Sequence, residues 1–159
     1  MTIAIMQPYF FPYIGYFQLV NSVDKFIIYD DVNFIKQGWI ARNRIILHGE
    51  EHYLILQLNG ASWFKKINEI HIGTNADKLL KTIYQAYNKA PFFPSSFPII
   101  EKIIKVNIKN LADFLINQLI ILTSYLGIST ELLISSSINK NNNLKGSKKI
   151  IHICNILGA

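Results

Sequence analysis

Cysteine and charged residues are scarce in this sequence. Cys154 is the only cysteine among 159 residues, which excludes an internal disulfide and a thiolate metal cluster. Charged residues make up 16% of the chain and hydrophobic residues 50%, a balance that favours a packed core over disorder. The histidines lack the spacing of a metal site, so we predict no structural metal; they are His48, His52, His71 and His152.

Long uninterrupted apolar runs are also missing. The most apolar stretch, LADFLINQLIILTSYLG, contains Asp113, Asn117 and Gln118, which predicts a buried helix instead of a membrane span. The N-terminus has neither the basic region nor the long apolar region of a signal peptide. We therefore expect a cytoplasmic protein without membrane insertion.

The net charge of +6 does not by itself indicate a protein that binds nucleic acid. The lysines are scattered, and no run of basic residues reaches the length of a binding motif. A nucleic-acid partner is therefore not expected, whereas a moderately electropositive groove for phosphates agrees with the composition.

The N-terminal pattern predicts a parallel α/β unit. The apolar runs TIAIM and KFIIYD flank a helix-like segment that begins near Gly15. A strand, a helix and a second strand in this order form a βαβ unit with a right-handed crossover. We predict an α/β fold with a Rossmann-like, nucleotidyltransferase-type parallel sheet.

The rest of the chain adds an insertion and a helical segment. Residues 41–72 predict an antiparallel insertion, with a hairpin around His48-Gly49 and INEIHI as a third strand. Residues 75–127 predict three helices, and a strand and a final helix follow. We expect one domain over residues 1–159. Because the chain stops after a helix without the next parallel strand, we also expect it to be truncated at its C-terminal end.

The loop after the first strand is the first candidate for a ligand site. Ligands of open α/β sheets bind at the carboxyl ends of strands, where the residues from Gln7 to Tyr16 lie. Gly15 permits close backbone approach near a helix N-terminus, which favours an anion such as phosphate. Gln7, Tyr13 and Tyr16 supply hydrogen-bonding groups. The alternative is a structural corner whose phenylalanines belong to the core.

The same loop is similar in shape to the phosphate-binding turn of nucleotidyltransferases. Those enzymes carry His-x-Gly-His after the first strand, where this chain reads Tyr13-Ile14-Gly15-Tyr16. Tyrosine cannot supply the positive charge of a protonated histidine at neutral pH. Adenylyl transfer by that mechanism is therefore not expected, and the likeness is one of fold alone.

Charged residues follow the second predicted strand and provide further candidates. Asp30 and Asp31 end this strand, and neighbouring side chains point to opposite faces, so at most one faces the cleft. We assign Asp31 as a general base, with magnesium binding or a strand-end turn as the alternatives.

The segment NFIKQGWIARNRI suits a phosphorylated ligand with a flat ring, because it combines cationic side chains with an indole. Its candidates for substrate binding are Lys36, Trp39, Arg42 and Arg44. A solvated hairpin anchored by the tryptophan is the alternative. Near the C-terminus, KGSKK places lysines at a helix start, which the helix dipole disfavours unless an anion is present. A solvated loop is the favoured interpretation there.

The stretch MQPYFFPYIGYFQLVNSVDKFIIYDDVNFIKQGWIARNRI closely resembles the N-terminus of the WbqC-like protein family. The resemblance continues through IYQAYNKAPFF and KGSKKIIHICNILGA and so covers most of the chain. It implies a role in bacterial O-antigen or other surface-polysaccharide biosynthesis, and with it the modification of an amino-sugar precursor by acyl or aminoacyl transfer. Members continue past the Leu-Gly-Ala segment, in agreement with the expected truncation.

The resulting hypothesis is a transferase that acts on a nucleotide-linked amino sugar, with no cofactor identified and Mg²⁺ unsupported. Gln7, Tyr13 and Tyr16 would hold the donor or sugar, Asp31 would accept the amine proton, and Lys36, Arg42 and Arg44 would bind phosphates. A non-catalytic protein that binds sugar nucleotides, or a scaffold of the same pathway, is one alternative. A nucleotidyltransferase-like enzyme is the other.

Overall fold

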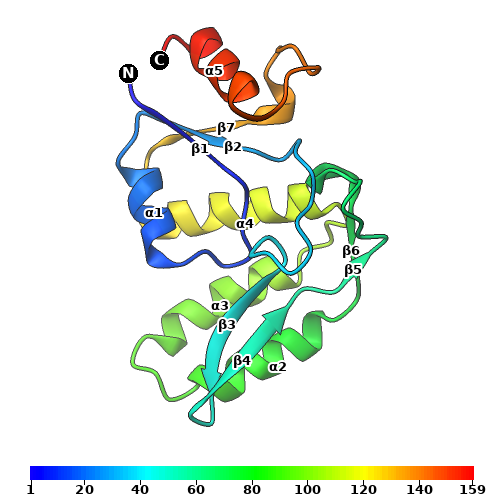
Figure 1. The fold of residues 1–159 in the computed structure, drawn as a ribbon. Coiled ribbons are helices and arrows are strands. Elements are labelled where there is room, and N and C mark those ends of the chain that lie inside the picture. The colour runs from blue at the N-terminus through cyan, green and yellow to red at the C-terminus, as the bar shows by residue number, and fades with distance from the viewer.

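The computed structural model describes all residues 1–159. A three-stranded parallel sheet lies in the upper part of the molecule, beneath the C-terminal helix (Figure 1). Strands β1 (Ile3–Met6) and β2 (Lys25–Ile28) are joined by helix α1 (Ile14–Asn21), which confirms the predicted βαβ unit. Strand β7 (Glu131–Ile134) pairs in parallel with the other side of β2, so the strand order is β1-β2-β7.

Strand β2 is buried on both faces, as expected for the central strand of a parallel sheet. Phe26 and Ile28 belong to the main core, whereas Ile27 is equally buried but lies outside that cluster. The alternation places Ile27 on the opposite face of the sheet. Helix α4 (Leu111–Tyr125) covers one face, and the final helix α5 (Gly146–Leu157) covers the other (Figure 1).

The predicted hairpin is present as β3 (Arg42–Leu47) and β4 (Glu50–Ile55). His48 and Gly49 connect the strands with φ angles of 54° and 83°. Two consecutive residues with positive φ define the turn that best matches the twist of a two-stranded ribbon. The hairpin runs beside helix α2 (Ala76–Tyr87) and away from the parallel sheet (Figure 1).

The third antiparallel strand predicted at INEIHI does not join the hairpin. Residues Ile67–Glu69 form the 3-10 helix η1, and only His71–Ile72 form a strand, β6. This strand pairs with β5 (Leu58–Asn59) in a separate two-stranded sheet. Ile67 and Ile70 are fully buried, so their spacing of three follows the turn of η1 and not the period of a strand.

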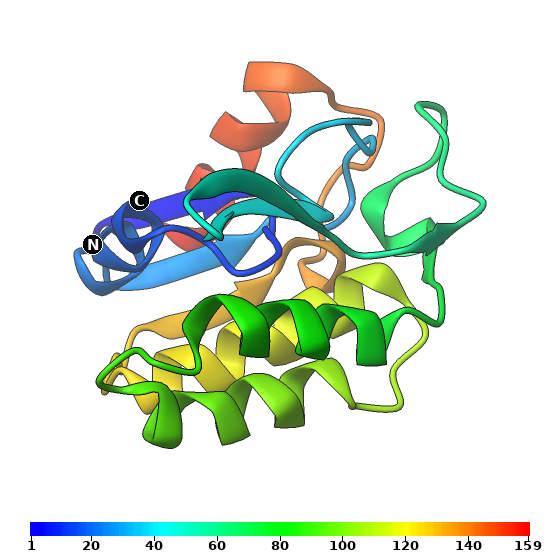
Figure 2. The same ribbon diagram turned by 90° about the horizontal axis from the view of Figure 1, so that it is seen from below.

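The predicted helical segment contains α2 (Ala76–Tyr87), α3 (Phe93–Ile104) and α4 (Leu111–Tyr125). Helix α2 lies against α3, and α3 against α4 (Figure 2). Gly127 has a φ of 69° just after the C-cap of α4, a conformation that ends the helix. Helix α3 begins at Phe93, because Pro94 fits the first turn of a helix.

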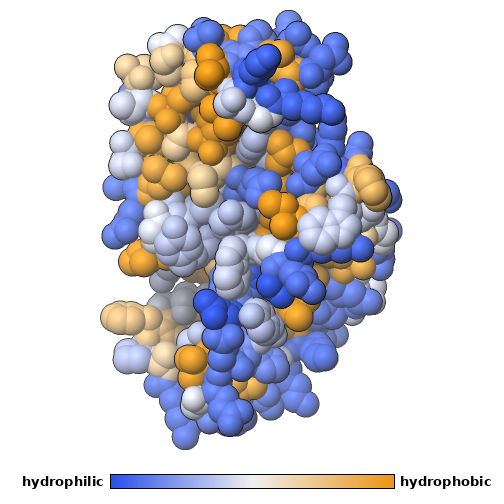
Figure 3. Space-filling model, in the orientation of Figure 1, coloured by the Kyte–Doolittle hydropathy of each residue, from blue (hydrophilic) through white to orange (hydrophobic).

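Together the elements form a mixed α/β fold with one main core cluster between the parallel sheet, the hairpin and the helices. On the face shown in Figure 3, apolar side chains gather over the region of β1 and α5, and the lower part of the molecule is mainly hydrophilic. None of the helices is long and apolar enough to cross a membrane.

Candidate functional site

The carboxyl ends of the three parallel strands lie in one row. Met6 pairs with Ile28, and Ile28 pairs with Ile134, so the loops that follow these residues begin side by side. Every site residue predicted from the sequence lies in or just after the first two of these loops. The register of the sheet therefore brings the starts of these two loops to the same edge, the carboxyl edge, of the parallel sheet.

The loop between β1 and α1 is held rigidly by side chains from two distant elements. Gln118 on α4 donates from Nε2 to the Tyr9 carbonyl at 2.9 Å and accepts from the Phe11 N–H at 3.1 Å. Asn43 on β3 donates to the carbonyls of Phe10 and Phe11. Phe11 has a φ of 45°, a conformation that a non-glycine residue keeps only where its surroundings enforce it.

Tyr16 lies between this loop and the core, and its side chain does not face solvent. Its side chain is 1% exposed, contacts Phe26, and donates its hydroxyl to the Gln7 carbonyl at 3.0 Å. Burial, and then the nearby Tyr9, raise the pKa of Tyr16 above its ordinary value. The sequence suggested direct ligand contact for Tyr16, but the structure places it in the core as a support for the loop.

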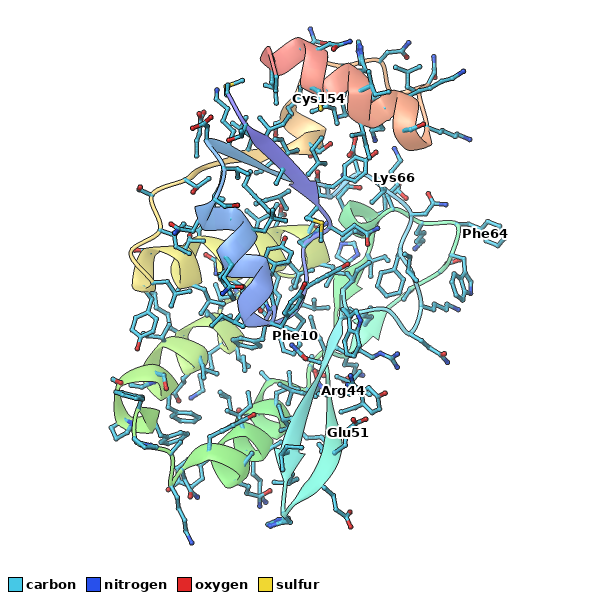
Figure 4. All side chains as sticks on the ribbon, turned by 60° about the vertical axis from the view of Figure 1, so that its left-hand side comes forward. Phe10, Arg44, Glu51, Phe64, Lys66 and Cys154 are labelled. Atoms are coloured by element: carbon cyan, nitrogen blue, oxygen red, sulfur yellow. The ribbon has the colours of Figure 1, made fainter.

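A pocket of about 380 Å³ opens above this loop. The loop contributes three aromatic rings and a proline, and the segment after β2 together with β3 supplies an indole, an amide and a guanidinium. The lining residues are Tyr9, Phe10, Pro12, Tyr13, Trp39, Asn43 and Arg44. Figure 4 shows Phe10 near the start of α1 and Arg44 on the adjoining part of the hairpin. The structure thus brings together three predicted residues, namely Tyr13, Trp39 and Arg44.

Gly15 has a steric role at this pocket. A Cβ atom at Gly15 would lie 2.5 Å from the Tyr13 ring, so glycine lets that ring rest against the first turn of α1. No side chain caps this turn, since Tyr13 at the N-cap forms no capping hydrogen bond. The first N–H groups of α1 consequently lack side-chain acceptors beside the pocket.

Trp39 is contacted by both arginines of the hairpin. The guanidinium carbons of Arg42 and Arg44 lie 5.9 and 5.2 Å from the centre of its ring, so the two arginines share one face of β3. Arg44 also pairs with Glu51 at 2.8 Å on the exposed side of the hairpin (Figure 4). Arg42 stacks on Tyr53 at 4.9 Å and donates to the Gln37 carbonyl.

The predicted phosphate-binding residues do not form a single group. Arg44 lines the pocket described above, but Lys36 and Arg42 line a second cavity of about 340 Å³ between the segment after β2 and the end of β4. The Nε atom of Arg42 is buried there without a hydrogen-bond partner. The three cationic residues predicted to bind phosphate are therefore divided between the two cavities.

Asp31 lies in a buried ionic cluster apart from the aromatic pocket. Its Oδ2 atom is 3.0 Å from Lys140 Nζ and 2.9 Å from Lys149 Nζ, and Ser135 donates its hydroxyl to Oδ1 at 2.7 Å. The side chains of Asp31, Lys140 and Lys149 are 6%, 1% and 8% exposed. The cluster fastens α5 and the loop after β7 to the end of β2.

Burial and hydrogen bonding have opposite effects on the pKa of Asp31. Burial raises the pKa, but hydrogen bonds from Lys149, Ser135 and Lys140 outweigh this effect, so the pKa of Asp31 lies below its ordinary value. Two ammonium groups also occupy the position that a cation would need. No group of three or more His, Cys, Asp or Glu side chains suited to a metal ion occurs in the structure.

Asp30, like Asp31, lies in the loop after β2, which ends at Ile28, and not at the end of the strand as predicted. Its carboxylate accepts hydrogen bonds from the Ser136 N–H at 2.9 Å and the Asn68 amide at 3.2 Å. Asp30 is 2% exposed, so it too is used within the protein. Both aspartates thus join the loop after β2 to segments much later in the chain.

Three contributors to this region were missed by sequence reasoning: Gln118, Lys140 and Lys149. Two of them left a signal. Gln118 interrupts an otherwise apolar helix, and Lys149 stands in the first turn of α5, where a lysine needs a nearby anion. The anion is the Asp31 carboxylate, whereas Lys145, at the start of the same helix, is exposed to solvent.

Comparison with known proteins identifies the family. The family model of the WbqC-like protein family matches residues 7–159. The chain belongs to the WbqC-like protein family. This confirms the resemblance seen in the sequence.

The chain is also similar to an uncharacterized protein of Mycobacterium tuberculosis, Rv1507c. The two are 34% identical over 137 residues, which cover 82% of this chain and 58% of that protein. The matched region thus spans less than two thirds of the length of this relative. No solved structure gives a significant match.

Proposed function

We propose that this protein binds a nucleotide-linked amino sugar in the pocket of Tyr9, Tyr13, Trp39 and Arg44, and that it serves bacterial surface-polysaccharide biosynthesis as an acyl or aminoacyl transferase. The pocket carries the proposal, because it joins aromatic surfaces to a cationic side chain at the carboxyl edge of a parallel sheet. Its volume of about 380 Å³ lies within the range of small-molecule sites. We also propose that this sheet edge is a Rossmann-type ligand edge in a cytoplasmic enzyme.

The proposed ligand position follows from the chemistry of the lining. A flat base stacks on the ring of Trp39 or Tyr9, as aromatic surfaces favour. The phosphates lie toward Arg44 and the uncapped first turn of α1, since both attract anions. The sugar then occupies the side of the pocket near Tyr13, whose ring is 67% exposed and whose hydroxyl is available for hydrogen bonding.

The surroundings of Asp31 favour a positioning role over the proton-accepting role expected from the sequence. One carboxylate oxygen accepts a hydrogen bond from Ser135, and the other forms an ion pair with Lys149. The lowered pKa of Asp31 also makes it a weaker base. In this proposal Asp31 fixes the loop that carries Trp39. The reaction would then depend on orientation of the two substrates, which can lower a barrier substantially without a dedicated base.

A non-catalytic protein that binds sugar nucleotides is the second candidate function. It is favoured by one observation: the seven residues that line the pocket include no carboxylate, imidazole or thiol. The same lining gives no support to an adenylyl-transfer mechanism that relies on paired histidines.

Binding measurements with UDP- and dTDP-linked amino sugars test the shared part of both candidates. We expect Trp39→Ala and Arg44→Gln each to weaken binding about tenfold or more, because each removes a stacking or charge-assisted contact. Trp63→Ala and Lys105→Gln serve as matched controls, since they remove the second tryptophan and another exposed ion pair. Affinity unchanged in both pocket variants would refute the assigned site.

Mass spectrometry then separates the enzyme from the binding protein. The protein is incubated with a nucleotide-linked amino sugar and an acyl or aminoacyl thioester, and the sugar is examined for the added group. Product formation that is lost in Trp39→Ala supports the transferase. Tight binding of the nucleotide-linked sugar, with no group added to it from either an acyl or an aminoacyl thioester, supports the non-catalytic candidate.

A further inference from the structure

The loop at residues 60–66, which follows β5, presents two aromatic side chains to solvent. Trp63 is 53% exposed and Phe64 is 92% exposed. Figure 2 shows this loop extending away from the rest of the fold, and Figure 4 shows Phe64 at its outer end, pointing away from the protein. We refer to residues 60–66 as the aromatic–lysine loop.

The aromatic–lysine loop is fixed by hydrogen bonds to the segment after β2. Asn33 donates its side-chain amide to the Trp63 carbonyl at 3.1 Å, and the Phe34 N–H donates to the Lys65 carbonyl at 2.9 Å. Within the loop, the Phe64 N–H donates to the Ser62 hydroxyl. Because its backbone is held at several points, the exposure of Phe64 is a property of the fold and not of a free chain end.

Basic side chains surround the exposed rings. Lys65 and Lys66 follow Phe64 directly and are both exposed. The segment bridged to the loop adds exposed Lys36 beside Ile35, which is 47% exposed. One acidic residue, Glu69, follows in η1, and its carboxylate is used by the Lys66 backbone N–H at 2.8 Å. The patch is thus apolar at its tip and positively charged at its base.

We propose that the aromatic–lysine loop binds the surface of a lipid bilayer that contains anionic lipids. Aromatic side chains enter the boundary between headgroups and acyl chains, and lysines pair with the negative surface. The charge of the three lysines selects this partner over a neutral apolar surface. The contact is peripheral and needs no membrane-spanning helix.

Sedimentation with vesicles tests this proposal. We expect the protein to bind vesicles made from a mixture of phosphatidylglycerol and phosphatidylcholine. It should bind vesicles of pure phosphatidylcholine far more weakly. Phe64→Ser should reduce partitioning about tenfold or more, as expected from loss of one buried aromatic ring. Lys65→Gln with Lys66→Gln should reduce it about fivefold for each charge at low salt.

Matched variants control for general effects of charge and exposed apolar area. Phe92 is 78% exposed on the loop before α3, so Phe92→Ser removes a similar ring elsewhere. Lys78→Gln with Lys81→Gln removes the same charge from α2. Both control proteins should bind as the unmodified chain does, and circular dichroism should show all variants folded.

Three results would overturn the proposal. The first is absence of binding to the anionic vesicles, and the second is equal loss of binding in the control variants. The third is self-association in solution that Phe64→Ser abolishes while vesicle binding is unaffected, which would assign the loop to a protein interface. None of these results bears on the sugar-nucleotide pocket, whose binding assay contains no lipid.

Discussion

Replacement of Asp31 by asparagine provides the most direct test of the buried ionic cluster. The substitution keeps the size of the side chain but leaves two ammonium groups, Lys140 and Lys149, without their shared counter-charge. Their side chains are only 1% and 8% exposed, so water cannot compensate for the loss. Breaking a buried ion pair by removal of one partner costs about 3–5 kcal/mol.

This cost is a large part of the stability of a typical domain, which totals about 5–15 kcal/mol. For a chain of this size, about 3–5 kcal/mol corresponds to a decrease in Tm of roughly 6–20 °C. Urea unfolding followed by circular dichroism and tryptophan fluorescence measures the change. The control is Glu101→Gln, which removes an exposed pair with Lys105 and should cost only about 0–1 kcal/mol.

A double variant distinguishes lost pairing from simple loss of a carboxylate. Lys149→Met in the Asp31→Asn background removes one of the unpaired buried charges, so it should recover part of the stability. The pH dependence gives an independent check. Because the pKa of Asp31 is lowered on folding, its contribution is present above the unfolded value near 4 and is lost as the pH falls through the folded pKa. A loss in Asp31→Asn no greater than in Glu101→Gln would refute this account.

Two further predictions concern the loop after β1. Gln118→Leu should destabilise the protein by about 2–4 kcal/mol, since it leaves the Tyr9 carbonyl and Phe11 N–H unpaired, and calorimetry of sugar-nucleotide binding should show weaker affinity. Unchanged stability would mean that water replaces the amide. Tyr16→Phe should cost about 1 kcal/mol near pH 7. Because burial raises the pKa of Tyr16, its contribution is full below about pH 10 and is lost at higher pH, so the variant should resist alkaline unfolding better.

Features that depend on neighbours in the chain were predictable from the sequence. The βαβ unit, the hairpin at His48-Gly49 and the end of α4 at Gly127 follow from apolar periodicity and from residues that tolerate positive φ. The family was also evident, because long stretches of the chain resemble it. The 3-10 helix η1 was mistaken for a strand because short apolar patterns fit both structures.

Parts of the candidate site are also encoded locally. Tyr13 and Trp39 each lie in a segment that sequence reasoning assigned to ligand binding, and Arg44 follows them on β3. The sequence could not show that Arg42 and Lys36 line a different cavity from Arg44. This division depends on how the segment after β2 packs against the end of β4, and no local pattern reports that packing.

Apart from η1, the sequence by itself determined the main helices and strands, and it placed polar and aromatic residues just after the first two parallel strands. Tertiary structure decided what those residues do. Asp31 meets Lys149 across 118 positions of the chain, and Phe11 meets Gln118 across 107. A carboxylate looks the same in the sequence whether it faces a substrate or two buried lysines, because desolvation and charge pairing arise only when distant segments come together.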